Sequence, residues 1–129
     1  SNAQILFRDQ TVLTLGEDTE LTLDDFIYNS ETHDGNFVTE VKSGTVKFIT
    51  GQISKLNPDN LEVKLPEGTL GARGTEFVVL SEKNKKSTIV LLGPGPNNSL
   101  GMIPGSLQIS DGNNMVSITN PGYQAMIEN

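Results

Sequence analysis

The chain has 129 residues, with 9 lysines and arginines against 16 aspartates and glutamates, a net charge of −7 and no cysteine. This length predicts one domain with a core of its own, and the lack of cysteine excludes disulfides and thiolate metal sites. The acidic balance argues against a nucleic-acid partner, because binding to phosphates needs clustered basic residues. The one basic cluster, Lys83, Lys85 and Lys86, has the composition of a solvated turn.

The first residues, Ser-Asn-Ala at 1–3, are interpreted as the remnant of a cleaved purification tag. The single domain is therefore expected to span residues 4–129, and this end of the chain carries no information about targeting. No run of apolar residues approaches the roughly 20 that are needed to cross a bilayer. We expect no membrane insertion by these residues.

A period of two dominates the rest of the chain and predicts half-buried strands. Turn formers such as Asp34-Gly35 and Asn57-Pro58 separate the strands, and no stretch keeps a period of 3.6. The predicted class is all-β: a two-layer β-sandwich or a β-solenoid-like domain of short strands with bulged corners. The alternating stretches lie around residues 13–15, 21–23, 37–41, 61–65, 107–109 and 116–118, and residues 88–92 are apolar on both faces.

The stretch LPEGTLGARGTEFVV places Arg73 between Gly71 and Gly74. Before these glycines the apolar side chains occupy even positions, and after them, from Phe77 on, they occupy odd positions. A strand cannot change its buried face without an inserted residue or a bend. We therefore predict a β-bulge or corner between Gly71 and Gly74, and a similar change of parity predicts another around Gly51.

Arg73 has two interpretations. Its guanidinium can act as a structural clamp that pairs with Glu76, Asp24 or Asp25, because arginine offers five donors in a fixed plane. The same fork can instead hold a carboxylate or sugar ligand. We favour the clamp, since an arginine at a strand corner needs a partner if it is buried.

The one histidine, His33, lies in an apparent turn and is expected to be a solvated loop residue, because a catalytic histidine needs a nucleophile and an orienting acid. Glu31, His33, Asp34 and Asn36 are an alternative set of loop metal ligands. Hard cations need several oxygens at ordered spacing, however, and the calcium-loop pattern is missing. We expect no metal site.

Asp24 and Asp25 are adjacent, so on a regular strand they would face opposite sides and could not form a glycosidase pair. The glycine-rich stretch 93–101 lacks the lysine and the following helix of a phosphate-binding loop. We therefore expect no catalytic residue and no cofactor. The sequence predicts a protein that is not an enzyme.

Residues 62–79, EVKLPEGTLGARGTEFVV, resemble the signature of the FecR-domain family, in which a strand and a turn precede a Gly-x-Arg-Gly-Thr-x-Phe run. The stretches 21–28 and 44–66 are similar to what precedes this signature in one branch of the family, and the resemblance extends from about residue 5 to 127. Leu65-Pro66-Glu67 replaces the usual Thr-Pro start, and the insert at 93–105 is unusually rich in Pro and Gly. The signature residues here are Gly71, Arg73, Gly74, Thr75, Glu76 and Phe77.

The resemblance implies a periplasmic or extracellular domain of a bacterial envelope protein. The best-known members sense a signal and pass it through the membrane to a sigma factor, but they use a transmembrane helix and a cytoplasmic segment, which these residues do not contain. The expected function is therefore non-catalytic binding or signal sensing. The alternative is a structural or scaffolding domain of a larger cell-surface protein with no ligand of its own.

The expected partner is an envelope protein or a polysaccharide, neutral or basic in view of the acidic chain. Loops on a rigid β scaffold commonly carry recognition. The loops around 29–36 and 93–105 are therefore the predicted contact sites.

Overall fold

The computed structural model describes residues 3–73, 76–82, 86–93, 106–110, 115–118 and 124–128. The fold is all-β, as the sequence predicts, with one short helix and one 3₁₀ turn among the described residues. The elements in chain order are β1 (Ala3–Leu6), β2 (Val12–Leu15), β3 (Glu20–Tyr28), β4 (Gly35–Ile49), α1 (Gln52–Leu56), the 3₁₀ turn η1 (Pro58–Asn60), β5 (Leu61–Leu65), β6 (Gly68–Arg73), β7 (Glu76–Ser81), β8 (Lys86–Gly93), β9 (Ser106–Ser110), β10 (Met115–Ile118) and β11 (Gln124–Glu128).

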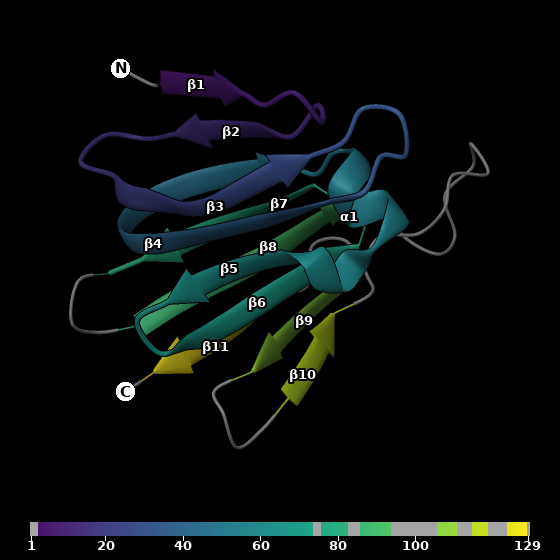
Figure 1. Cartoon of the computed structure of the whole chain (residues 1–129). Helices are drawn as coiled ribbons and strands as arrows, with labels where there is room; N and C mark the ends of the chain where they lie inside the picture. Colours follow the sequence, from purple (N-terminus) through teal and green to yellow (C-terminus); the bar gives the residue numbers. More distant parts are fainter. Residues whose placement is uncertain are drawn as a thin grey trace.

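The strands form two layers that share β4. Sheet A has the strand order β1-β2-β4-β7-β8-β11, and sheet B has the order β3-β4-β5-β6-β9-β10. In Figure 1, β5, β6, β9 and β10 lie in the near layer, and β7, β8 and β11 lie behind them. All described neighbours pair antiparallel except β4 and β5, which run parallel. The residues between β4 and β5 form α1 and η1 at one end of the two layers (Figure 1).

The long strand β4 passes from one sheet to the other at Gly44. Its first half buries odd-numbered residues such as Phe37 and Val41, and its second half buries even-numbered ones, Val46 and Phe48. Gly44 has φ +103°, and a Cβ there would lie 2.5 Å from Cα of Thr19. Only glycine fits this bend, and the change of buried face, unrecognised in the sequence, follows from it.

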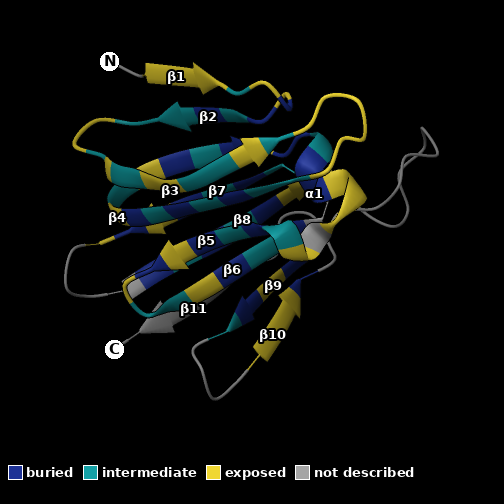
Figure 2. Cartoon of the chain, viewed as in Figure 1, coloured by how far each residue is buried: buried dark blue, intermediate teal, exposed yellow. Residues whose placement is uncertain are grey.

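The core lies between the two layers and includes large aromatic side chains. Phe48 and Phe77 of sheet A stack with ring centroids 4.8 Å apart. Phe37 of sheet B packs edge-on against Phe7 at 4.9 Å and against Phe26 at 5.7 Å. Figure 2 shows buried residues alternating with intermediate and exposed ones along the central strands, the pattern that the period of two predicts.

The predicted corner around Gly51 is wrong, because the strand ends at Ile49 and helix α1 begins at Gln52. The glycine is required for a different reason. A Cβ at residue 51 would lie 2.2 Å from the backbone oxygen of Asp9, because the loop after β1 closes on the start of α1. The backbone N–H of Gln52 donates to this same oxygen at 2.8 Å.

Candidate functional site

The signature stretch joins the two sheets, since β6 belongs to sheet B and β7 to sheet A. The register of β6 against β9 is regular through Arg73, which lies opposite Ser106. A register shift occurs at Glu76/Phe77 against β8. The change of parity therefore coincides with the passage from sheet B to sheet A. Gly74 and Thr75 lie outside the described residues, so a bulge at Gly74 stays a prediction.

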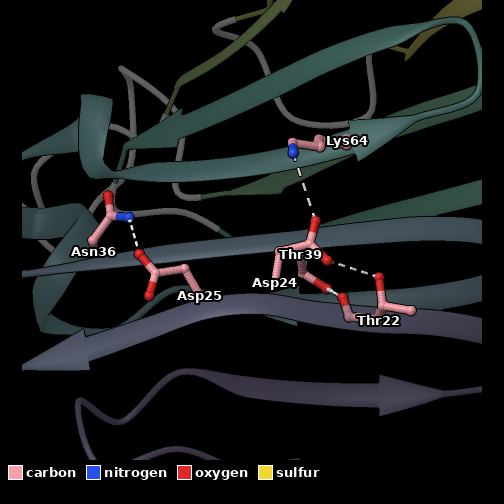
Figure 3. Close-up of polar contacts among 6 residues, drawn as sticks. All are labelled: Thr22, Asp24, Asp25, Asn36, Thr39 and Lys64. Atoms are coloured by element: carbon pink, nitrogen blue, oxygen red, sulfur yellow. Dashed lines mark hydrogen bonds and ion pairs between the residues drawn. The ribbon is translucent and has the colours of Figure 1, made fainter.

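The Arg73 clamp also stays a prediction, because the side chain of Arg73 lies outside the described part of the structure. The three carboxylates expected to receive it already have partners. Asp24 lies 3.6 Å from Nζ of Lys64, and Asn36 Nδ2 donates to Asp25 at 2.7 Å (Figure 3). For the third, Glu76 Oε1 lies 2.7 Å from Nζ of Lys47.

The expectation that Asp24 and Asp25 face opposite sides of the sheet is wrong. The register of β3 against β4 shifts between Leu23 and Asp25, so Asp24 is an extra residue in β3. Both carboxylates then reach groups on the outer face of sheet B, Lys64 and Asn36 (Figure 3). Inserting one residue brings two consecutive side chains to the same face.

The loop at 29–34 is exposed, as predicted, and His33 lies in it with φ +62°. Tyr28 Oη and His33 Nδ1 are 2.7 Å apart. Asn60 Nδ2 donates to the backbone oxygen of Gly35 at 2.7 Å, which ties the end of the loop to η1. A hollow of about 310 Å³ lies between this loop and η1. Of the second predicted contact loop, 93–105, only Gly93 is described.

A larger hollow, which we call the groove, lies on the outer face of sheet B. It has a volume of about 460 Å³ and follows β6 between β5 and β9, with η1 at one end and β10 at the other. Gly71 forms part of its floor, because no side chain rises there between the neighbouring strands. Its lining residues include Asp59, Glu62, Thr69, Gly71, Ser106, Gln108, Ser110 and Met115.

The groove is polar and acidic. Asp59 and Glu62 supply carboxylates, Thr69 supplies a hydroxyl and Gln108 supplies an amide. Within the described residues, neither Asp59 nor Glu62 has a hydrogen bond or ion pair from its side chain. No described side chain in the lining is basic or aromatic. Chemically, the groove can accept hydrogen bonds and bind a cationic group.

The groove could not be predicted from the sequence, because its walls come from segments that are distant in the chain. Glu62 and Gln108 are brought to one face by the neighbouring pairings of β5 with β6 and of β6 with β9. One sign was present in the sequence. Gly71 occupies an outward-facing position in the alternation between Leu70 and Ala72, where strands normally carry a polar side chain.

One family model matches this chain. The family model described as FecR protein matches residues 1–94, which is most of the chain. The chain therefore belongs to the FecR protein family, as its signature stretch predicted. A comparison with curated proteins finds no match.

Two solved structures share the fold, and both are described as a "putative anti-sigma factor from Parabacteroides distasonis ATCC 8503". The first has 12% sequence identity and a TM-score of 0.69, and the alignment covers 99% of this chain and 51% of the other. The second has 14% identity, a TM-score of 0.66 and the same coverage. The chain thus spans about half the length of these neighbours. Helices able to span a bilayer are absent from the described residues.

Proposed function

We propose that the chain is a non-catalytic, extracytoplasmic binding or signal-sensing module of a bacterial envelope protein, and that the groove is its contact surface. Membership of the FecR family supports this role. The observation that carries the proposal is the position of Gly71, a residue of the family signature, on the floor of the groove. The compartment, periplasmic or extracellular, is part of the proposal.

Gly71 differs from the glycines that the backbone needs. Gly44 has a positive φ, and an added Cβ at Gly44 or Gly51 would lie within 2.5 Å of backbone atoms. At Gly71 the φ is ordinary, and among the described atoms an added Cβ would meet only the backbone oxygen of Leu61, at 3.9 Å. The fold therefore tolerates a side chain at residue 71, and glycine there keeps the groove open.

The chemistry of the groove supports binding more than catalysis. Asp59 and Glu62 are carboxylates, but the described lining offers no histidine, lysine or nucleophile paired with a base. The description of the structural neighbours as anti-sigma factors supports a protein as the partner. Control of a sigma factor is not carried over, because the chain spans only half of those proteins.

Filling the groove tests the proposal. Gly71→Gln places a long polar side chain over the floor, and Leu80→Gln adds the same side chain on the outer face of sheet A, where Leu80 is exposed. Each variant is used as bait in envelope extract and on a glycan array. We expect the wild-type chain and Leu80→Gln to retain the same partner, and Gly71→Gln to lose it.

Three outcomes would contradict the proposal. If Gly71→Gln retained the partner, the groove would not be the contact surface. No partner for the wild-type chain in either assay would favour the scaffolding alternative. Turnover in a hydrolase screen that survives repurification would make the protein an enzyme.

A further inference from the structure

Two acidic side chains in the groove over Gly71 have no partner among the residues that the structure describes. Elsewhere on the surface several carboxylates are paired with lysine, whereas Asp59 and Glu62 have no such partner in the described part of the chain. Asp59 and Glu62 therefore make the described part of the groove negatively charged, on a chain whose net charge is already −7. The lysine-paired carboxylates are Glu20 with Lys42, Asp24 with Lys64 and Glu76 with Lys47.

The shape of the groove suits an extended segment. Ser106 and Ser110 both line it, so it follows β9 for about 13 Å at the usual rise of a strand. That length accommodates about four residues of extended chain. The floor strand β6 pairs with β5 on one side and with β9 on the other. Its backbone is occupied by this pairing, so an occupant is recognised by side chains rather than by adding a strand.

We propose that the groove takes an extended segment of a partner protein that carries lysine or arginine side chains. This inference rests on the proposed function and specifies the partner. An occupant removes water from Asp59 and Glu62, and a carboxylate that loses water without gaining a cation is costly. Lysine or arginine supplies that cation, and arginine can bind a carboxylate with two hydrogen bonds.

The remaining lining favours a peptide over a saccharide. Gln108 can donate to and accept from peptide groups, and the hydroxyl of Thr69 can do the same. None of the described lining residues is an aromatic on which a sugar ring could stack. Met115, which is exposed at the β10 end, offers an adaptable apolar contact to the alkyl part of a long side chain.

The test uses an eight-residue peptide, acetylated and amidated, in which lysine and threonine alternate. A matched peptide has glutamine in place of each lysine. Binding is followed by amide NMR shifts of the folded chain, which give both the affinity and the location. We expect the lysine peptide to shift the amides of Glu62, Gly71 and Gln108, and the glutamine peptide to bind at least several-fold more weakly.

Charge variants separate the groove from the general acidity of the protein. Asp59→Asn with Glu62→Gln removes two charges from the groove, and Glu31→Gln with Glu82→Gln removes two charges from exposed positions elsewhere. Exposed ion pairs contribute up to about 1 kcal/mol each, so the first pair of substitutions should weaken binding about three- to tenfold. The second pair should change the affinity less than twofold.

Equal binding of the two peptides, shifts centred on another surface, or equal weakening by the two charge variants would each overturn the inference. These outcomes are distinguishable from failure of the proposed function. If the lysine peptide does not bind but the wild-type chain still captures an envelope partner that Gly71→Gln loses, the groove is a binding site for a different chemistry.

Discussion

At the scale of single residues, glycine serves opposite purposes in this chain. At Gly51 the backbone of the loop after β1 lies so close that no side chain fits, with Asp9 O at 2.2 Å and Thr11 N at 2.5 Å from the position of an added Cβ. At Gly71 the surroundings leave room. The same residue type therefore marks a packing constraint in one place and an open surface in the other.

Alanine substitutions should separate these two roles. Gly51→Ala forces backbone atoms apart, and overpacking of this kind costs about 1–3 kcal/mol of unfolding free energy. Gly71→Ala should change the unfolding free energy by no more than about 0.5–1 kcal/mol in either direction. Urea unfolding with unchanged slopes measures both values. A larger loss for Gly71→Ala than for Gly51→Ala would contradict this assignment.

The predicted Arg73 clamp should contribute little to the free energy of unfolding. The side chains of Asp24 and Glu76 are 34% and 38% exposed and already have lysine partners. An ion pair from Arg73 to either carboxylate would be an exposed one, so Arg73→Ala should cost about 1 kcal/mol or less. Urea unfolding measures the loss, and its disappearance in high salt would confirm an ion pair. A loss of about 3 kcal/mol or more would indicate a buried partner instead.

At the scale of elements, helix α1 depends on a residue far away in the sequence. Asp9 is 1% exposed, and its carboxylate accepts hydrogen bonds from Thr11 N at 3.0 Å, Thr11 Oγ1 at 2.9 Å and Ile53 N at 3.3 Å. The N-cap residue Gly51 has no side chain to cap the helix. Asp9 takes that role from the loop between β1 and β2.

Removing this cap should destabilise the protein. Asp9→Ala leaves buried donors at Thr11 and Ile53 without a partner, which costs about 1–3 kcal/mol. Asp9→Asn keeps one acceptor oxygen and should lose less. Asp59→Ala is the control, because Asp59 is exposed and has no partner among the described residues. Thermal unfolding ranks the variants, and an equal loss for Asp9→Ala and Asp59→Ala would exclude the capping role.

The sequence predicted the strands better than their connections. Alternation identified the stretches around Leu13, Leu21, Phe37 and Leu61, because one face of each strand is buried whatever its neighbours are. It missed α1, since a five-residue helix has too few turns to show a period and its start is held by Asp9. It also missed the passage of β4 between the sheets, because the approach of Thr19 to Gly44 is a tertiary contact.

The candidate site was less predictable than the strands. The signature stretch was recognised from the sequence. The groove, however, depends on which strands become neighbours. The alternation of apolar residues shows which face of a strand is buried, but it does not show the order of the strands in the sheet. The pairing of β5 with β6 and of β6 with β9 brings Glu62, Gly71 and Gln108 close together. In the sequence, β6 and β9 are separated by β7 and β8, which belong to sheet A. Such an arrangement is set by topology.

At the scale of the whole molecule, the two hollows described above both lie on the side of sheet B. Sheet B presents the groove and the polar contacts of Asp24 and Asp25 (Figure 3). Exposed apolar side chains occur in both sheets and include Leu80 and Leu92 in sheet A and Ile27 and Met115 in sheet B. The polar face of sheet B also lies beside η1, which contributes to both hollows. Recognition in the proposed function is therefore assigned to one side of the molecule.

The sharing of β4 by the two sheets has a consequence for amide exchange with solvent. Neither sheet can open fully without breaking the pairing of β4 with β2, β3, β5 or β7. The amides of residues 37–41 and 46–48 should then exchange only when the whole chain unfolds, with one common free energy. Hydrogen–deuterium exchange measures this directly. If the two halves of β4 exchanged with two distinct free energies of opening, the two sheets would open separately. That outcome would contradict the prediction that residues 4–129 form a single domain.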